Sequence, residues 1–359
     1  MTFFAIPRPP FLLLLIFLNA SSASRANSSV RARTMPLING TLPEEYKVLI
    51  QSYSFTVVVP LICLVAFLIG LPSNLLALFV LLFRTKKLPS TILLINLTIC
   101  DLLLLLVLPF RIIYHFLGNN WTFGEPFCRV VIGLLYGNAY GSVVCLALIA
   151  VDRYIALVHP FGAKMLRSKK NSVCMSVLVW IVVVAAVVPI LASQQSQTIT
   201  DTQTTCHDAL PIEQHEKYFL PYFAVLFSIC FLLPLLVVVY CYSAVLRTLM
   251  AEGQRFAHAI RVTVLMLMVF MVCFLPSNIL LLLHYSKSAF DLYVPYQIAL
   301  SFSTFNSCFD PFIFYYVSKD FRKKLWEALR CSRSDSESSS ELRTKITLLS
   351  KITRSEGTA

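Results

Sequence analysis

Residues 55–83 read FTVVVPLICLVAFLIGLPSNLLALFVLLF, and this run decides the fold class of the chain. It contains no Asp, Glu, Lys or Arg, and it exceeds the roughly 20 apolar residues that a helix needs to cross a bilayer core. Inside a membrane, every backbone N–H and C=O group must find a partner within its own segment. The run therefore predicts a transmembrane α-helix.

Further apolar runs of similar length follow along the chain: residues 92–116, 127–157, 173–192, 218–246, 259–285 and 293–317. The 359 residues are 57% hydrophobic and only 13% charged, with a mean hydropathy of +0.75. A water-soluble domain of this length would carry far more charge. We therefore expect an all-α membrane protein, a bundle of seven transmembrane helices over residues 53–318.

The N-terminal leader has Arg8, an apolar stretch at residues 11–18 that is too short to span, and the small residues NASSAS at 19–24. This order is typical of a secretory signal peptide, which we assign to residues 1–24. An additional membrane anchor is the alternative for the same stretch. Residues 25–52 then form a polar N-terminal tail ahead of the first span.

Basic side chains concentrate in every second loop between the apolar runs. They are Arg84, Lys86, Lys87, Lys164, Arg167, Lys169, Lys170, Arg247 and Arg255, followed after the last run by Lys319, Arg322, Lys323 and Lys324. By the positive-inside rule these loops face the cytoplasm, so the N-terminus is expected outside. The net charge of +12 is then explained without a nucleic-acid partner, and we expect a multi-pass protein of the plasma membrane.

The predicted outer side carries three glycosylation sequons, at Asn27, Asn39 and Asn120. Among the cysteines, only Cys128 and Cys206 fall at the predicted outer face. Because the exterior of the cell is oxidising, we expect a disulfide between these two residues.

Two carboxylates, Asp101 and Asp310, lie inside predicted spans, where charge is costly and usually functional. Each lies about 13 Å from the cytoplasmic end of its span, at 1.5 Å of rise per residue. Ser142, Asn306 and Ser307 can reach a similar depth. This group is predicted to hold an allosteric sodium ion or a shared proton. The alternative is that each carboxylate pairs only with nearby amides and water. No other metal or cofactor is expected.

The third apolar run ends in the sequence DRY, at residues 152–154. Further motif residues occur in the other runs: Asn74, LTICD ending at Asp101, Trp180, Pro234, FLP at 274–276 and DP at 310–311. Together these resemble the rhodopsin-like G-protein-coupled receptors across the membrane domain. The resemblance implies coupling to heterotrimeric G proteins at the cytoplasmic face, through Asp152, Arg153, Tyr154 and Tyr242.

The loop after the fourth run reads TTCHDALP, at residues 204–211. This loop, FLPSN at 274–278, LLLLHYS at 280–286 and NSCFDPF at 306–312 resemble the protease-activated receptors, and the fourth subtype is the most similar. A peptide or lipid receptor that shares part of the loop by chance is the alternative. In the resembled family a serine protease cuts the outer tail, and the new N-terminus then binds to the receptor as a tethered ligand.

Arg33 is the expected cleavage site, because trypsin-like proteases accept Arg in their specificity pocket, and Arg31 is the competing site. Cleavage would expose a ligand with the sequence TMPLIN: Thr34, Met35, Pro36, Leu37, Ile38 and Asn39. Asp208 is expected to pair with the new amino group. The remaining ligand-binding residues are expected to be Tyr136, His207, Leu210, His284, Tyr285 and Tyr296.

Glu44, Glu45 and Tyr46 resemble the acidic, aromatic tail of hirudin, which implies docking on the basic exosite of thrombin. A solubilising pair of acids ahead of the membrane is the alternative. Thrombin is favoured over other trypsin-like proteases, although Ala32 stands where thrombin usually favours proline.

Phe314 stands where the family resemblance leads us to expect a tyrosine in the seventh run. Residues 319–331 have an amphipathic pattern and predict a cytoplasmic helix at the membrane surface, ending at Cys331, a palmitoylation candidate. Residues 332–359 are serine-rich and predicted to be disordered, with sites for receptor kinases and arrestins.

By resemblance, the leading hypothesis is a receptor that couples to Gq/11 and G12/13 after cleavage. One alternative is a class A receptor for a diffusible peptide or lipid, whose tail is never cut. Another is a transporter or channel built around Asp101 and Asp310. No catalytic constellation is visible in the sequence, so an enzyme is not expected.

Overall fold

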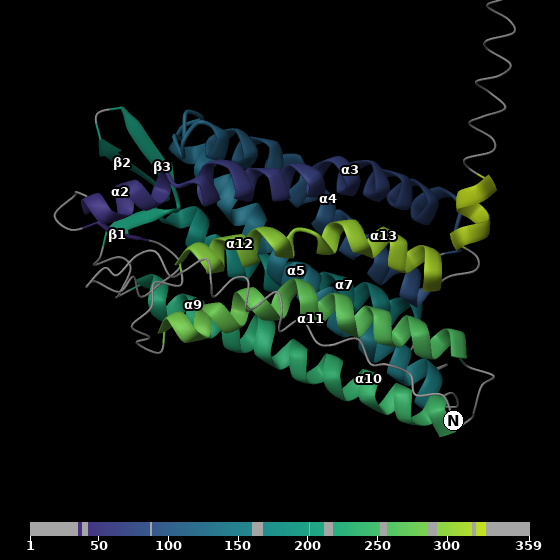
Figure 1. Ribbon diagram of the computed structural model, residues 1–359. Coiled ribbons are helices and arrows are strands. Elements are labelled where there is room, and N and C mark those ends of the chain that lie inside the picture. Colours follow the sequence, from purple (N-terminus) through teal and green to yellow (C-terminus); the bar gives the residue numbers. More distant parts are fainter. Residues whose placement is uncertain are drawn as a thin grey trace, which may run out of the picture.

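The computed structural model describes residues 35–37, 42–86, 88–159, 168–200, 202–211, 218–251, 257–285, 293–317 and 321–327. Within these residues, long helices run side by side as an elongated bundle, and the strands gather at one end of it (Figure 1). We call this end the strand end. It is the end that the sequence predicts to be extracellular.

The helices are α2 (Glu44–Ile50), α3 (Val59–Phe83), α4 (Pro89–Phe116), α5 (Glu125–Val158), α7 (Lys169–Ala192), α9 (Leu220–Phe227), α10 (Leu233–Ala251), α11 (Ala257–Tyr285), α12 (Tyr293–Ser303) and α13 (Asn306–Val317). Two π-helical segments, Ser54–Val58 and Ser228–Leu232, lead into α3 and α10. The strands are β1 (Met35–Leu37), β2 (Ser196–Thr200), β3 (Gln203–Cys206) and β4 (Ala209–Pro211). β2 and β3 form an antiparallel hairpin, whereas β1 pairs in parallel with β4.

Six helices in the described part of the chain are individually long and apolar enough to cross a membrane. They correspond to the first six predicted runs. The seventh run is helical as well, but it consists of two shorter pieces, α12 and α13. The predicted all-α bundle is therefore confirmed, and its seventh span is interrupted between α12 and α13.

Hydroxyl side chains explain the break in the seventh run. Ser303 Oγ donates to Leu300 O, and Thr304 Oγ1 donates to Ser301 O, both at 2.6 Å. Phe305 N then bonds to Phe302 O, three residues back, at 3.0 Å. Side-chain donors that compete for backbone carbonyls tighten a helix locally and interrupt its regular hydrogen bonds.

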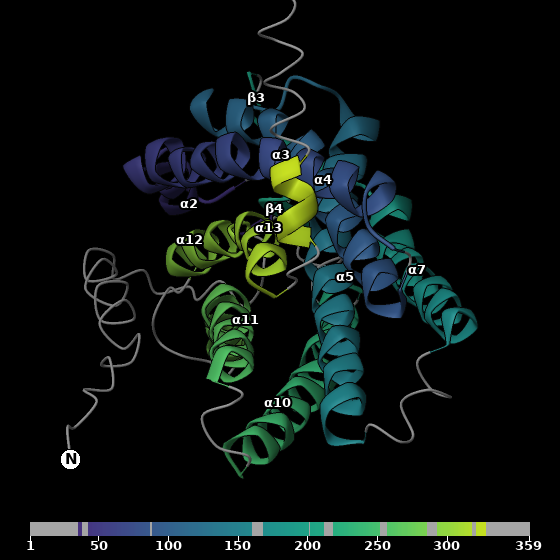
Figure 2. The ribbon, with the colours of Figure 1, turned by 90° about the vertical axis from the view of Figure 1, so that its right-hand side faces the viewer.

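The central helix of the bundle is α5, which contacts α4, α7 and α10 and is surrounded by them in the view of Figure 2. Three glycines along α5 let α7 approach closely. A Cβ atom at Gly133 would lie 3.0 Å from side-chain atoms of Leu191 and Val187, and one at Gly141 would lie 3.1 Å from Val183. Small residues four positions apart on one helix are typical of close helix packing inside membranes.

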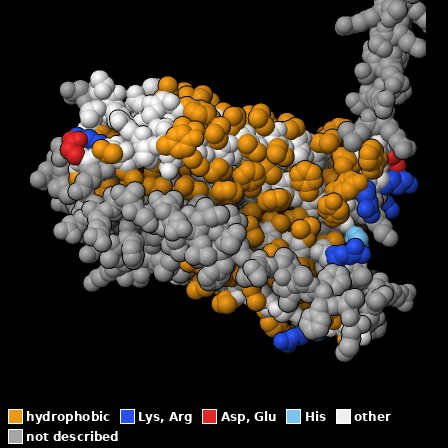
Figure 3. Space-filling model, viewed as in Figure 1, with side chains coloured by type: hydrophobic (Ala, Val, Ile, Leu, Met, Phe, Trp, Pro, Cys, Tyr) orange, Lys and Arg blue, Asp and Glu red, His pale blue; other side chains and the backbone are white. Residues whose placement is uncertain are grey.

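Apolar side chains cover the middle of the bundle on the face shown in Figure 3, and Lys and Arg gather at the end opposite the strand end. Large aliphatic side chains on the spanning helices α3, α7 and α10 are strongly exposed, for example Leu68 at 61%, Ile181 at 60% and Leu236 at 60%. An apolar surface of this extent matches the hydrocarbon core of a bilayer.

The last part of the predicted N-terminal tail, helix α2, packs on the bundle. Helix α2 buries Tyr46 and Ile50, which are 3% and 1% exposed, and leaves Val48 exposed at 72%. This amphipathic pattern docks one face of α2 on the strand end of the bundle. The tail is therefore partly a structural element of the receptor domain.

Residues 321–327 form the described part of the helix predicted over 319–331, and this helix turns away from the axis of α13 (Figure 1). The ring of Phe321 is buried against Phe314, with 6.2 Å between ring centroids and an interplanar angle of 83°. Phe314, which replaces the expected tyrosine, thus anchors the last helix by aromatic packing.

Candidate ligand-binding site

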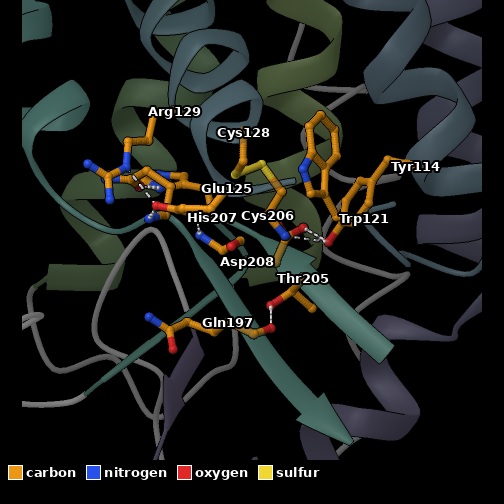
Figure 4. The surroundings of a disulfide bond; sticks show 12 residues. Tyr114, Trp121, Glu125, Cys128, Arg129, Gln197, Thr205, Cys206, His207 and Asp208 are labelled. Carbon is orange, nitrogen blue, oxygen red and sulfur yellow. Dashed lines mark hydrogen bonds and ion pairs between the residues drawn. A yellow bond between two sulfur atoms is a disulfide. The ribbon is translucent and has the colours of Figure 1, made fainter. Parts of the chain in front are cut away.

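A disulfide joins the loop between α7 and α9 to the start of α5. Cys206, the last residue of β3, is bonded to Cys128, and the two Cα atoms are 5.8 Å apart (Figure 4). The expected bridge is therefore present. The bridge fixes the two residues that follow Cys206, His207 and Asp208, at the strand end of the bundle.

Glu125, at the first position of α5, fixes the start of the same loop. Its carboxylate oxygens accept the backbone N–H groups of Gln195 at 2.8 Å and Ser196 at 2.6 Å. The guanidinium of Arg129 donates to one of these oxygens at 2.7 Å. In Figure 4, Glu125 and Arg129 lie on one side of the bridge and Tyr114 on the other. Glu125 was not among the predicted site residues, because an acid at the start of a predicted helix was its only signal.

His207 turns the chain sharply after the bridge, with a φ of 68° that few non-glycine residues adopt. Its backbone N–H donates to Gln195 O at 2.8 Å. The imidazole lies 2.7 Å from Gln195 Oε1 and 3.0 Å from the hydroxyl of Tyr136. Leu210 is buried in the same apolar cluster as Tyr136. Three predicted ligand-binding residues, His207, Tyr136 and Leu210, are thus brought together.

Asp208 is buried, with 2% of its surface exposed, and it holds two helices at once. Its carboxylate accepts the hydroxyl of Tyr114 from α4 at 2.6 Å and that of Tyr293 from α12 at 2.9 Å. Gln297 donates to the Tyr293 hydroxyl at 3.0 Å. The buried cation Arg111 also attracts Asp208 electrostatically. These partners come from distant parts of the chain, so they were not predicted.

β1 contains Met35, Pro36 and Leu37, which are three of the predicted ligand residues. These pair in parallel with β4 in the register Met35 with Ala209, Pro36 with Leu210 and Leu37 with Pro211. The predicted ligand segment therefore lies directly beside Asp208, which precedes Ala209 in the chain.

The side chain of Leu37 is 4% exposed and belongs to an apolar cluster at the strand end. The other buried members of this cluster are Leu42, Tyr46, Ile50, Phe55, Ile199, Ala209 and Tyr293. For the ligand freed by cleavage, Met35 and Leu37 are expected to meet Tyr136, His284, Tyr285 and Tyr296. In the uncut chain, pairing with β4 keeps β1 at the rim, and Tyr136 and Tyr296 belong to two other apolar clusters.

The protease-docking prediction differs from the structure at Tyr46. Glu44 is exposed and pairs with Lys47 at 2.7 Å, but Tyr46 is buried in the cluster around Leu37. The aromatic part of the hirudin-like sequence is therefore occupied in packing within the receptor, because it lies on the apolar face of α2.

Several predicted residues lie outside the described part of the structure. They are Arg31, Arg33, Thr34, Ile38, Asn39, Asn27 and Cys331, together with the side chains of Met35, Pro36, Glu45, His284 and Tyr285. The sequon residue Asn120 is described and accepts the backbone N–H of Thr204 at 3.0 Å.

The predicted polar group inside the bundle is brought together around Asp101. Its Oδ1 accepts Ser307 Oγ at 2.9 Å, Asn138 Nδ2 at 3.1 Å and Ser142 Oγ at 3.5 Å. Asp310 is close enough for the two carboxylates to repel each other. Asn138 was not predicted, because the sequence alone does not show which side of its helix a single asparagine in an apolar run faces.

Three oxygen atoms in this group have no hydrogen-bond partner among the described residues. They are Oδ2 of Asp101 and both carboxylate oxygens of Asp310, and all three are buried. The Nδ2 atom of Asn306, also buried, is unpaired in the same sense. Buried polar atoms without partners are costly, so a ligand, a proton or water has a place here.

At the opposite end of the bundle, the predicted G-protein-coupling residues, three consecutive ones in α5 and Tyr242 in α10, make separate contacts. Asp152 is buried, and the hydroxyl of Tyr154 lies 3.0 Å from Nε2 of His159. The hydroxyl of Tyr242 contacts the sulfur of Met266 at 3.5 Å. The Nε atom of Arg153 has no hydrogen-bond partner within the described residues.

Comparison with known families gives a match over residues 73–314 to the 7 transmembrane receptor (rhodopsin family). The chain is 43% identical to Proteinase-activated receptor 4 of Rattus norvegicus over 305 residues, which cover 84% of this chain and 77% of that protein. It is 43% identical to Proteinase-activated receptor 4 of Homo sapiens over 289 residues, covering 79% and 75% of the two chains. Proteinase-activated receptor 2 of Mus musculus is 38% identical over 323 residues, covering 84% and 80%.

Substitution of Glu125 should loosen the loop that carries Asp208. Glu125→Ala leaves the N–H groups of Gln195 and Ser196 without their acceptor, at about 1–3 kcal/mol for each unpaired group. We expect hydrogen–deuterium exchange of residues 195–200 to become about tenfold faster or more. Glu44→Ala, which removes an exposed carboxylate at the same end, is the control. Unchanged exchange in Glu125→Ala would show that the bridge alone holds the loop.

Proposed function

The chain belongs to the proteinase-activated receptor family of rhodopsin-type seven-transmembrane receptors, and on this premise we propose that cleavage after Arg33 activates it. It is a multi-pass plasma-membrane receptor rather than an enzyme, and its family implies activation by proteases and signalling through G proteins. The ligand freed by cleavage begins at Thr34 and has the sequence TMPLIN.

The pairing of β1 with β4 is the observation that carries this proposal. It places part of the ligand sequence, residues 35–37, on the loop that contains His207 and Asp208. The residue that becomes the N-terminus, Thr34, is one position before Met35, and Asp208 is one position before the partner of Met35. In a parallel pair the two strands run in the same direction. A cationic N-terminus at Thr34 is therefore created on the side where Asp208 lies.

Charge explains why cleavage matters. Before cleavage the nitrogen of Thr34 is a neutral amide, whereas afterwards it is an α-amino group with a pKa of about 7.7–8.0, largely cationic at neutral pH. An ammonium makes a stronger hydrogen bond to a carboxylate than a neutral hydroxyl does. The new N-terminus thus competes with Tyr114 and Tyr293 for Asp208.

Release of Tyr293 would act on the seventh span, because this residue begins α12. The same span is interrupted at Thr304 and then carries Ser307 and Asp310, which form part of the polar group around Asp101. A change at Asp208 can therefore shift α12 relative to α13. Such a shift is the step that we assign to activation of Gq/11 and G12/13, followed by receptor kinases and arrestins.

Thrombin is the protease that we assign first, ahead of other trypsin-like serine proteases, on the basis of Arg33 and the acidic residues after it. Of the docking residues whose side chains the structure describes, Glu44 is exposed and paired with Lys47, whereas Tyr46 is buried.

The polar group around Asp101 fits a sodium ion. Sodium prefers oxygen ligands, and the site offers carboxylate oxygens of Asp101 and Asp310 that lack protein partners, beside the hydroxyls of Ser142 and Ser307. Positive charge supplied there would reduce the repulsion between the two carboxylates. No cofactor is proposed beyond this ion.

Cleavage at Arg33 is tested by sequencing the receptor's N-terminus after brief treatment with purified thrombin. The expected new sequence is Thr-Met-Pro-Leu, and Arg33→Gln should lose both this product and the response to protease. Soluble TMPLIN should still activate Arg33→Gln, because the receiving site is unchanged. Arg31→Gln is the matched control and should be cut normally. A protease response that survives in Arg33→Gln would reject the site, and loss in Arg31→Gln would move the cut upstream.

Pairing of the new amino group with Asp208 is tested with soluble TMPLIN and its N-acetylated form. On the unsubstituted receptor, acetylation should reduce potency by about 10- to 100-fold, the effect of removing one charged hydrogen bond of roughly 1.5–3 kcal/mol. On Asp208→Asn the two peptides should be equally weak. Tyr293→Phe, which keeps the carboxylate, is the control and should still distinguish them. Equal discrimination by Asp208→Asn and the unsubstituted receptor would exclude the pairing.

The sodium site is tested by measuring TMPLIN affinity while sodium replaces N-methyl-D-glucamine at constant ionic strength. Affinity should depend on sodium in the unsubstituted receptor and be independent of it in Asp101→Asn, which lacks the charge. If both proteins respond alike, sodium does not act through Asp101.

A further inference from the structure

Building on the proposed function, we infer that the intact, uncleaved chain already holds residues 35–37 at the ligand-binding site, and that tail helix α2 forms one wall of that site. Cleavage then adds a charge to a ligand that is already in place. The site for Leu37 is an apolar pocket at the rim, separate from the residues predicted to receive it.

The pocket around Leu37 is built from two sources. The tail itself contributes Leu42, Tyr46 and Ile50, and the bundle contributes Phe55, Ile199, Ala209 and Tyr293. Each of these residues is at most 8% exposed. Leu37 therefore fills the space between the tail helix and the bundle, and an empty pocket would leave a cavity between them.

The walls of the pocket are held in position independently of Leu37. The rings of Phe55 and Tyr293 stack, with 5.7 Å between their centroids, and Tyr293 is also bonded to Asp208. The side-chain amide of Asn119 donates to the carbonyl oxygen of Ile50. The Oδ1 atom of Asn119 lies 2.6 Å from Nδ1 of His115 on α4. Helix α2 is thus tied to the bundle at its C-terminal end.

Backbone pairing sets the position of the segment along the pocket. The register places Leu37 opposite Pro211, and Met35 opposite Ala209. Leu37, at one end of the segment, lies in the pocket, and Met35, at the other end, pairs with the residue that follows Asp208. The intact chain therefore has the apolar contact of the ligand but lacks its charge.

A resident segment has a consequence for soluble agonist. The occupant is covalently attached, so its effective concentration at the pocket is of order millimolar. A soluble peptide binds only to the fraction of receptors whose pocket is open, and its apparent affinity falls by that same fraction. Weakening the resident Leu37 should therefore make an uncleaved receptor more sensitive to added TMPLIN.

Thiol labelling of purified, full-length receptor carrying Arg33→Gln tests occupancy without cleavage or signalling. Leu37→Cys should react with a water-soluble maleimide about tenfold more slowly than Val48→Cys, which sits at a position 72% exposed on α2. Modified peptides are identified by mass spectrometry, which separates these thiols from the native ones. Equal rates at the two positions would overturn the inference.

Two further measurements cover the case in which the cysteine itself loosens the segment. In the Arg33→Gln receptor without a cysteine, the amide of Leu37 should exchange hydrogen about tenfold more slowly than in an unstructured peptide of the same sequence. In the same background, Leu37→Ala should raise the potency of soluble TMPLIN by about three- to tenfold, and Val48→Ala should leave it unchanged. Rapid exchange together with unchanged potency would reject the resident segment.

These outcomes are separable from the proposed function. Failure of thrombin to release Thr34 would remove the protease step and leave the labelling result intact. Normal cleavage with rapid labelling of Leu37→Cys would retain the protease step and reject the resident segment alone.

Discussion

The bond between Cys128 and Cys206 is the constraint on which the strand end of this receptor depends. It attaches the loop to the central helix one residue before His207 and two before Asp208. Because the loop is fixed there, β4, which begins directly after Asp208, is held in position to pair with β1. Glu125 supplies a second attachment at the other end of the loop, so that the hairpin between the two anchors cannot slide along α5. The backbone pairing that we assign to the ligand, and the carboxylate of Asp208, therefore both belong to this fixed segment.

The seventh span connects that site to the polar group inside the bundle. Its first residue, Tyr293, donates a hydrogen bond to Asp208. Ser307 and Asp310 lie beyond the break in the same span and belong to the polar group around Asp101. A continuous helix would transmit a displacement rigidly, whereas hydroxyl groups at Ser303 and Thr304 have already replaced regular bonds in the middle. The two halves can therefore change their relative orientation without breaking the hydrogen bonds of an intact helix. The interruption lies close to Asp101, where repulsion between two carboxylates makes the local structure sensitive to an added proton or cation.

Sequence reasoning succeeded where the membrane itself restricts the choices. Long uncharged runs have to be helices, and only two cysteines lay on the predicted outer side, so the spans and the bridge followed from composition and position. The carboxylates at equal depth, Asp101 and Asp310, were also found, because charge inside a membrane is rare. The partners of Asp208 were not, since Tyr114 and Tyr293 are ordinary aromatic residues whose meeting depends on how three elements pack. Likewise, the acidic sequence around Tyr46 suggested a surface patch, and only the amphipathic docking of α2 buried its ring.

The shortness of the ligand strand locates its specificity in side chains rather than in the backbone. A parallel pair of three residues is too short to be stable alone, and Pro36 in the middle has no N–H group to donate. Burial of Leu37 has to supply the missing stability, and fully burying a leucine side chain contributes roughly 1.5–3 kcal/mol. In the activation that we propose, cleavage adds an amino group at Thr34 to this segment. Because Leu37 is three positions after Thr34, an extended segment of about 10 Å can reach Asp208 and the apolar pocket at the same time. Recognition thus requires both a cation and a large aliphatic side chain at that spacing, which the uncut tail cannot present and a random cleavage product does not contain.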